Sequence, residues 1–266
     1  MLRGFYISAS GMTTSQTQMD VTSNNLSNTN TEGFKEDKPV FKAYPQKQLS
    51  RTNDNVQDLP ADSLDVTIDR RPDIGPLNMG SASDGSYTDY TQGGFKNTGN
   101  PLDFALDGDG FFEVQLPDGT RAYTRSGDFK LNQNGEVVTS NGYNVMGEDG
   151  PLQLPQNPGQ LNVTGNGQVL NNNGQSYGQL RVVQFENPQK LRKRGDTMFL
   201  QGENNEVIEA TEDVKVKHKH LEGSNTNPID EMTEMVRVSR RYEMNQRSLR
   251  RQDQMLQQAI QQVGRN

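Results

Sequence analysis

The sequence predicts an α+β fold, in which N- and C-terminal α-helices form a coiled-coil domain and the residues between them form an all-β module of hairpins. Two observations predict this fold. Apolar residues recur in alternating steps of three and four near both ends of the chain, which is the spacing of a helix in a coiled coil. Between the ends, short alternating segments are separated by turn residues, as in β-hairpins.

The composition is that of a chain with thin cores. Only 30% of the 266 residues are hydrophobic and there is no cysteine, whereas ordinary domains are roughly 45–50% apolar when Gly is counted. Such a chain can form small domains and segments that become ordered against a partner. The absence of cysteine excludes disulfides, zinc–thiolate sites and thiol catalysis.

Charge and hydropathy exclude two further classes of protein. No apolar run approaches the roughly 20 residues that a membrane-spanning helix needs, so an integral membrane protein is excluded. The net charge of -7 argues against nucleic acid as the main partner. Residues 1–8 have an apolar stretch too short for a cleavable signal peptide, so we expect any export to use another route.

The N-terminal segment predicts a helix that ends before the turn residues at 28–33. Gly4 and Gly11 weaken its first half, each by about 1 kcal/mol relative to Ala. The apolar stripe of this helix consists of Leu2, Phe5, Ala9, Met12, Gln16, Met19, Ser23 and Leu26.

The C-terminal segment predicts a longer helix, with Asn227 as N-cap, Pro228 at the first helical position and acidic residues in the first turn. Its stripe consists of Met235, Val238, Tyr242, Asn245, Leu249, Gln252, Leu256, Ala259 and Val263. A run of arginines follows the same helix and is interpreted as a solvated or inter-subunit face; it consists of Arg237, Arg240, Arg241, Arg247, Arg250 and Arg251.

Both stripes are narrow and contain polar residues, so each helix needs a second helix for stability. The partner can be the helix at the other end of the same chain, which gives a terminal hairpin, or helices of other subunits. The pattern favours a coiled coil that involves both termini.

The middle of the chain predicts β structure. Residues 110–116 and 121–125 are predicted strands joined by a turn at 117–120, and Asn-Gly turn signals flank a predicted strand at 136–139. Further strands are predicted over 178–185 and over 213–220, where residues alternate strictly. The predicted domains are residues 1–33 (N-terminal helix), 34–100 (extended or linker region), 101–221 (central β domain) and 222–266 (C-terminal helix).

No pattern of residues predicts catalysis or ligand binding. Residues 107–110, Asp-Gly-Asp-Gly, invite a calcium-loop interpretation, but Phe111 and Asp118 occupy positions that need a ligand oxygen and a Glu, so a tight turn is favoured. His218 and His220 share one face of a predicted strand without a third ligand. We therefore predict no catalytic residue, metal, cofactor or small-molecule substrate.

Three ordered motifs resemble those of the bacterial flagellar rod and hook protein family. The N-terminal motif comprises Ser10-Gly11-Met12, Asp20-Val21 and residues 24–35, Asn-Asn-Leu-Ser-Asn-Thr-Asn-Thr-Glu-Gly-Phe-Lys. The central motif comprises residues 99–112, Gly-Asn-Pro-Leu-Asp-Phe-Ala-Leu-Asp-Gly-Asp-Gly-Phe-Phe, and residues 123–129, Tyr-Thr-Arg-Ser-Gly-Asp-Phe. The C-terminal motif comprises Leu221-Glu222-Gly223-Ser224-Asn225, Glu231-Met232 and Arg241-Tyr242-Glu243-Met244-Asn245.

The resemblance implies a structural subunit of the flagellar basal-body rod in the cell envelope, not an enzyme. It implies self-assembly into a helical tube that transmits motor torque to the hook and filament, with copies of itself and other axial proteins as partners. It also implies passage through the flagellar type III export apparatus without a cleaved signal peptide. The chain length and central motif are most similar to those of the distal rod protein or its rod paralogues.

The predicted subunit interface combines the two helical stripes with the end of the N-terminal helix. It consists of Leu2, Phe5, Met12, Met19, Asn24, Asn25, Leu26, Met235, Val238, Tyr242, Asn245, Leu249, Leu256 and Val263. The alternatives are a hook or hook-like axial protein of the same family and, from a different class, a secreted carbohydrate-binding β protein with helical tails.

Overall fold

The computed structural model describes residues 2–43, 46–50, 73–78, 80–156, 161–195, 197–202, 205–209 and 214–263. The chain divides into two compact units. The helical unit consists of Met1–Val21, Pro39–Ser86 and Glu234–Asn266. The β unit consists of Thr22–Lys38 and Tyr87–Thr233 and therefore includes the last turn of the first helix and the first turn of the second.

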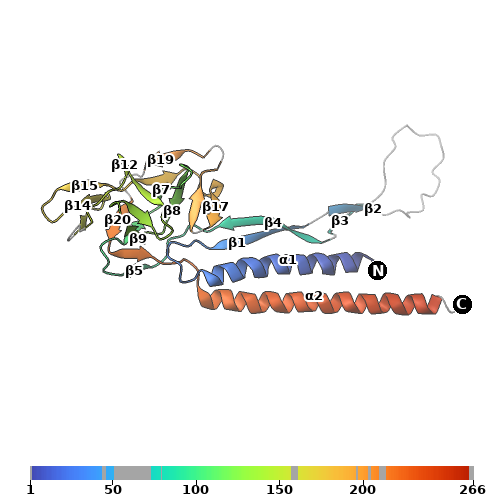
Figure 1. Cartoon of the computed structure of the whole chain (residues 1–266). Helices are drawn as coiled ribbons and strands as arrows, with labels where there is room; N and C mark the ends of the chain where they lie inside the picture. The colour runs from blue at the N-terminus through green and yellow to red at the C-terminus, as the bar shows by residue number, and fades with distance from the viewer. Residues whose placement is uncertain are drawn as a thin grey trace, which may run out of the picture. The chain divides into compact units, whose positions relative to one another are not determined.

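The two long helices are α1 (Leu2–Ser27) and α2 (Pro228–Val263), as the sequence predicts. The carboxamide oxygen of Asn227 accepts a hydrogen bond from the amide of Ile229 at 3.1 Å, which confirms the N-cap. The helices lie side by side and run antiparallel (Figure 1). Neither is apolar enough over a sufficient length to cross a membrane.

In the described part of the chain, four two-stranded sheets pair segments from distant parts of the sequence. They are β1 (Asp37–Ala43) with β4 (Ser81–Thr88), β2 (Gln46–Ser50) with β3 (Asp73–Asn78), β5 (Phe95–Asn97) with β21 (His220–Glu222), and β6 (Phe104–Asp107) with β20 (Lys215–His218). The region 34–100, expected to be extended, thus contributes β1 to β5. Its residues 51–72 lie outside the described part of the chain.

Two larger sheets lie within the β unit. The three-stranded sheet has the order β13 (Asn162–Val163), β14 (Gln168–Leu170), β15 (Ser176–Gln179). The largest described sheet contains β7 (Phe111–Gln115), β8 (Arg121–Thr124), β9 (Phe129–Leu131), β10 (Val137–Thr139), β11 (Asn144–Gly147), β12 (Gly150–Pro151), β16 (Val182–Phe185), β17 (Arg192–Gly195), β18 (Met198–Leu200) and β19 (Val207–Glu209). A 3-10 helix, Pro188–Lys190, precedes β17.

The predicted hairpin is confirmed, because β7 and β8 are antiparallel neighbours with Phe112 opposite Thr124. Gly119 in the turn between them has φ of 81°, a conformation that glycine adopts without a steric penalty. The predicted strand at 136–139 is also confirmed and corresponds to β10.

Two predicted strands are broken in the structure. The segment 178–185 divides into β15 and β16, which belong to different sheets. The segment 213–220 divides at Lys219, which has φ of 61° and passes the chain from the pair β20–β6 to the pair β21–β5. Strict alternation continues up to His218, with Val214 and Val216 buried. The break is a tertiary effect, because the Lys219 amide donates to the Asp103 carbonyl at 2.8 Å.

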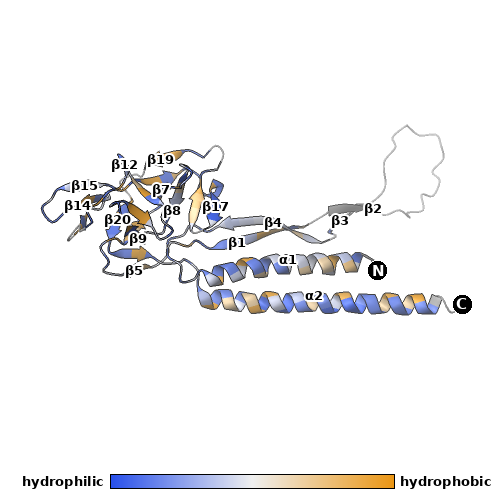
Figure 2. Ribbon diagram, in the orientation of Figure 1, coloured by the Kyte–Doolittle hydropathy of each residue, from blue (hydrophilic) through white to orange (hydrophobic). Residues whose placement is uncertain are grey.

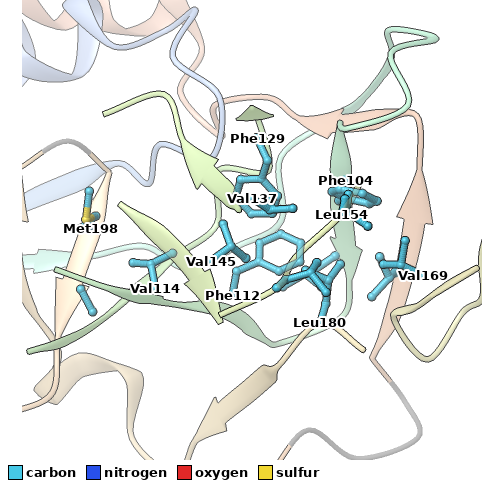
Figure 3. Packing of buried hydrophobic residues seen from close by; sticks show 14 of the residues in the cluster. Phe104, Phe112, Val114, Phe129, Val137, Val145, Leu154, Val169, Leu180 and Met198 are labelled. Carbon is cyan, nitrogen blue, oxygen red and sulfur yellow. The ribbon is translucent and has the colours of Figure 1, made fainter. Parts of the chain in front are cut away.

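The hydrophobic core lies within the β unit and gathers side chains from many short strands (Figure 3). The Phe129 ring contacts the rings of both Phe104 and Phe112, with centroids 5.8 Å and 5.2 Å apart. A second cluster surrounds Phe111 and Tyr123. By contrast, hydrophobic residues are interspersed with hydrophilic ones along both helices (Figure 2). The β unit can therefore bury apolar surface by itself, whereas the helices expose part of theirs.

Candidate functional site

The contact between α1 and α2 in the helical unit is made by small and amide side chains. The Ser8 hydroxyl donates to the Ser248 hydroxyl at 3.1 Å, and the Gln18 amide donates to the Glu234 carboxylate at 2.8 Å. A Cβ atom on Gly11 would lie only 2.7 Å from the Asn245 amide nitrogen. Glycine thus leaves room for a side chain of α2, and the two helices approach closely.

We call this contact the helix seam. On α1 it follows the positions of Gly4, Ser8, Gly11, Ser15 and Gln18, which adjoin the predicted apolar stripe but do not coincide with it. The sequence signal was small residues at alternating steps of four and three. We treated these glycines only as helix-weakening residues and so missed the seam.

The predicted interface residues differ in how deeply they are buried within the chain. Val238 is fully buried and Asn24 is exposed, whereas most of the apolar members remain partly accessible. The half-buried members are Phe5, Met12, Met19, Leu26, Met235, Tyr242, Asn245, Leu249 and Leu256. The side chains of Leu2 and Val263 lie outside the described part of the structure. The role of these residues between subunits stays a prediction.

Asn25 is 2% exposed, and its contacts lie within the chain. Its amide nitrogen donates to the Asp37 carbonyl at 2.9 Å, and its carbonyl oxygen accepts from the Asp37 amide at 3.1 Å. The carboxamide therefore ties the end of α1 to the start of β1. The predicted place of Asn25 in a subunit interface stays a prediction.

A cluster of buried charges joins the three motifs inside the β unit, and we call it the motif junction. The Lys35 ammonium lies 2.6 Å from one oxygen of the Glu222 carboxylate, and an Arg125 guanidinium nitrogen lies 3.3 Å from the other. Lys35 belongs to the N-terminal motif, Arg125 to the central motif and Glu222 to the C-terminal motif. All three side chains are almost completely buried.

Backbone groups bond further to Lys35 and Glu222, whereas the buried Nε atom of Arg125 has no hydrogen-bond partner among the described residues. Lys35 donates to the Thr91 carbonyl at 2.8 Å, and Glu222 accepts from the Gly93 amide at 3.0 Å. The Arg125 guanidinium lies over the Phe111 ring, 5.1 Å from its centroid. Burial lowers the pKa of the Lys35 amine and of the Arg125 guanidinium, and Glu222 opposes both changes. The carboxylate therefore holds two costly buried cations in place.

Glycines of the same motifs allow the backbones to meet closely at the junction. A Cβ on Gly127 would lie 1.7 Å from the Phe104 carbonyl oxygen, and one on Gly33 would lie 2.3 Å from the Ser126 amide nitrogen. Gly33 also has φ of 68°. These positions cannot take a larger residue without moving backbone, which is stiffer than a side chain.

Sequence reasoning missed the motif junction, because Lys35 and Glu222 are 187 positions apart. Charged residues are normally expected on the surface. The available signal was that each motif contains charged residues. That signal does not say which charges meet.

The residues weighed for metal binding have structural contacts instead. The segment 107–110 forms the predicted tight connection, from the end of β6 to the start of β7. His218 stacks on Phe104 with centroids 5.7 Å apart, and the Nδ1 atom of His220 lies 2.7 Å from the His218 carbonyl oxygen. Within the described residues, no group of three His, Asp or Glu side chains is placed to hold a metal ion.

Three segments match families of flagellar proteins. Residues 105–171 match the D1 domain of the flagellar hook protein FlgE/F/G, and residues 217–262 match the C-terminal part of flagellar basal body rod FlgEFG proteins. Residues 5–35 match the flagella basal body rod protein family. Lys35, Arg125 and Glu222 thus come from three separately matched segments.

The chain is also similar to rod proteins over nearly its full length. The flagellar basal-body rod protein FlgG of Buchnera aphidicola subsp. Schizaphis graminum is 33% identical over 267 residues, covering 97% of this chain and 98% of that protein. The FlgG proteins of Agrobacterium fabrum and Bacillus subtilis are each 31% identical, and the matches cover 96% and 98% of this chain and 97% and 98% of those proteins. The chain belongs to the flagellar basal-body rod protein family.

Proposed function

We propose that this chain is a structural subunit of the flagellar basal-body rod that assembles with copies of itself and with other axial proteins into a helical tube. The near full-length similarity to rod proteins of the basal body carries this proposal. Its work is mechanical rather than catalytic: the assembled subunits transmit motor torque to the hook and filament.

The terminal helices form the interface between subunits as a coiled-coil domain. Two observations support this role. The apolar stripe of each helix is only half-buried within the chain, so it keeps surface available for a neighbour. The helix seam is polar and narrow, and such a contact contributes little hydrophobic stabilisation by itself.

The motif junction fits the demand that torque places on a subunit. Glu222 connects segments that lead out of α1, through β7 and β8, and into α2. Force applied to the end of α1 or the start of α2 is thereby shared with the strands of the β unit that the junction connects. The thin, polar helical ends also suit a chain that the flagellar export apparatus carries unfolded and that becomes ordered as interfaces form.

A charge in the helix stripe tests the interface. We expect Leu249→Asp or Leu256→Asp to abolish incorporation into basal bodies and swimming motility, because an uncompensated buried carboxylate costs several kcal/mol. The β unit should retain its circular dichroism signal and unfolding midpoint. Lys215→Asp, an exposed change on the β unit, serves as the control and should be tolerated.

Imaging of labelled protein in purified basal bodies tests the location. We expect the label in the rod and not in the hook or filament. A label confined to another part of the flagellum, together with normal motility of the Leu249→Asp strain, would contradict the proposed function.

A further inference from the structure

Helix α2 has a marked separation of charge along its length. Its first two turns contain Asp230, Glu231 and Glu234 and no basic residue. From position 237 to position 251 the helix contains six arginines and only one acidic residue, Glu243. Two identical helices that are displaced along their axes therefore attract one another, with the acidic start of one beside the arginines of the other.

The acidic start of α2 also exposes large apolar side chains. Ile229 is 72% exposed and Met232 is 55% exposed, on either side of Asp230. They are three positions apart and so lie on the same face of the helix. The exposed first turn with Ile229, Asp230 and Met232 is called the acidic knob; Asp230 lies on the neighbouring face, because successive helical residues are rotated by about 100°.

The arginine-rich part of α2 borders a hollow in the helical unit. The hollow has a volume of about 410 Å³. It is lined in part by Gly11 and Ser15 of α1, Phe41 of β1, and Arg241 and Met244 of α2. Met244 is 62% exposed, so the lining of the hollow includes an accessible thioether together with a guanidinium and an aromatic ring.

We propose that the acidic knob of one copy docks into the hollow of a second copy, with Ile229 and Met232 against Phe41 and Met244, and Asp230 beside Arg241. The proposal rests on the proposed function, since it names the partner and the contact of the helical interface. It is heterologous, because two different surfaces of the same chain meet. Repetition of such a contact generates a helical filament rather than a closed dimer.

The geometry of α2 requires that the knob and the hollow belong to different copies. Ile229 and Met244 are 15 positions apart on one continuous helix, which separates them by about 22 Å at 1.5 Å per residue. No rearrangement of side chains within one intact helix closes that gap. Opposite charge and exposed apolar surface on both partners then specify a second copy rather than an unrelated ligand.

Disulfide trapping tests the contact directly, because the chain contains no cysteine. One strain would express two tagged copies, one with Ile229→Cys and the other with Met244→Cys, and isolated basal bodies would be oxidised. We expect a disulfide-linked heterodimer, since the bond requires Cα atoms about 4–7 Å apart. The control pair is Ile229→Cys with Met255→Cys, whose methionine is 54% exposed on α2 and thus similar to Met244.

Charge exchange provides a second, independent measurement. We expect Asp230→Arg and Arg241→Asp each to reduce incorporation about tenfold or more, because either places like charges in the contact. Co-expression of the two variants with each other should recover incorporation, because the knob of each variant then meets the hollow of opposite charge on the other, and the doubly exchanged chain should recover it as well. Arg250→Asp, an exposed arginine that does not line the hollow, is the matched control.

The outcomes separate this inference from the proposed function. If wild-type protein is absent from basal bodies, both are overturned. The protein can instead be present while the Ile229–Met244 cysteine pair forms no more heterodimer than the control pair and charge exchange restores no incorporation. In that case only the knob-and-hollow contact is overturned. A Met244→Cys copy that forms disulfides only with a cysteine-substituted different axial protein would likewise overturn it.

Discussion

The helix seam and the motif junction both join parts of the chain that are far apart in sequence, but they do so with different physics. The seam uses hydroxyls, amides and glycines between two helices, and its surroundings stay partly accessible to water. The junction uses three buried charges inside a packed β unit. A weak, hydrated contact suits helices that must rearrange during assembly. A specific contact that excludes water suits residues that must hold a domain together.

The motif junction should be the more sensitive of the two regions. Replacement of Glu222 by Gln keeps the shape of the side chain but leaves Lys35 and Arg125 buried without a negative partner. We expect the free energy of unfolding of the β unit to fall by about 3–5 kcal/mol. Chemical denaturation followed by circular dichroism measures this change.

The control for Glu222→Gln is Asp107→Asn. It removes the Asp107–Lys217 pair, whose side chains are both well exposed, and such surface pairs contribute about 0–1 kcal/mol. Equal losses of stability for the two variants would mean that the junction is no stronger than a surface ion pair.

The glycines of the two regions give a second contrast. Gly127→Ala places a Cβ against the Phe104 carbonyl, and we expect overpacking against backbone to cost about 1–3 kcal/mol. Gly11→Ala meets only the mobile end of Asn245, and the gain of about 1 kcal/mol in helix propensity offsets the displacement. Thermal unfolding of both variants checks the difference, and the opposite order would reverse our view of which contact is rigid.

Two neighbouring asparagines sharpen the comparison at the end of α1. Asn25→Leu removes both hydrogen bonds to the Asp37 backbone, and we expect a loss of about 1–3 kcal/mol because buried backbone groups lose their partners. Asn24→Leu, at an exposed position, should change stability little. Amide exchange near residue 37 should become faster only in the Asn25 variant. Similar exchange rates in both variants would mean that the Asn25 side chain does not stabilise the backbone at Asp37.

The smallest effect concerns acid stability at Asp89. Its hydrogen bond from Lys38, supported by the Thr91 amide, lowers the pKa of this carboxyl from 3.8 to about 2. A lowered pKa in the folded state contributes stability that is complete above 3.8 and is lost as the pH falls through about 2. Asp89→Asn should therefore flatten this part of the pH–stability curve slightly. The effect is small because the pair is partly solvated.

The sequence by itself determined the elements that depend on local chemistry. The N-cap at Asn227, the uninterrupted pattern of α2 and the turn around Gly119 follow from short-range preferences, and they appear where the sequence predicts them. Family membership could be recognised from three motifs because they are ordered and long.

Only the tertiary structure decided which residues meet. It divided the 213–220 alternation at Lys219, because the two halves pair with different strands. It selected glycines and serines rather than the apolar stripe for the helix seam, because close approach favours small side chains over hydrophobic ones. It also brought Lys35, Arg125 and Glu222 together. The course of the whole chain decides which residue a buried charge contacts, and the residues next to it in sequence do not.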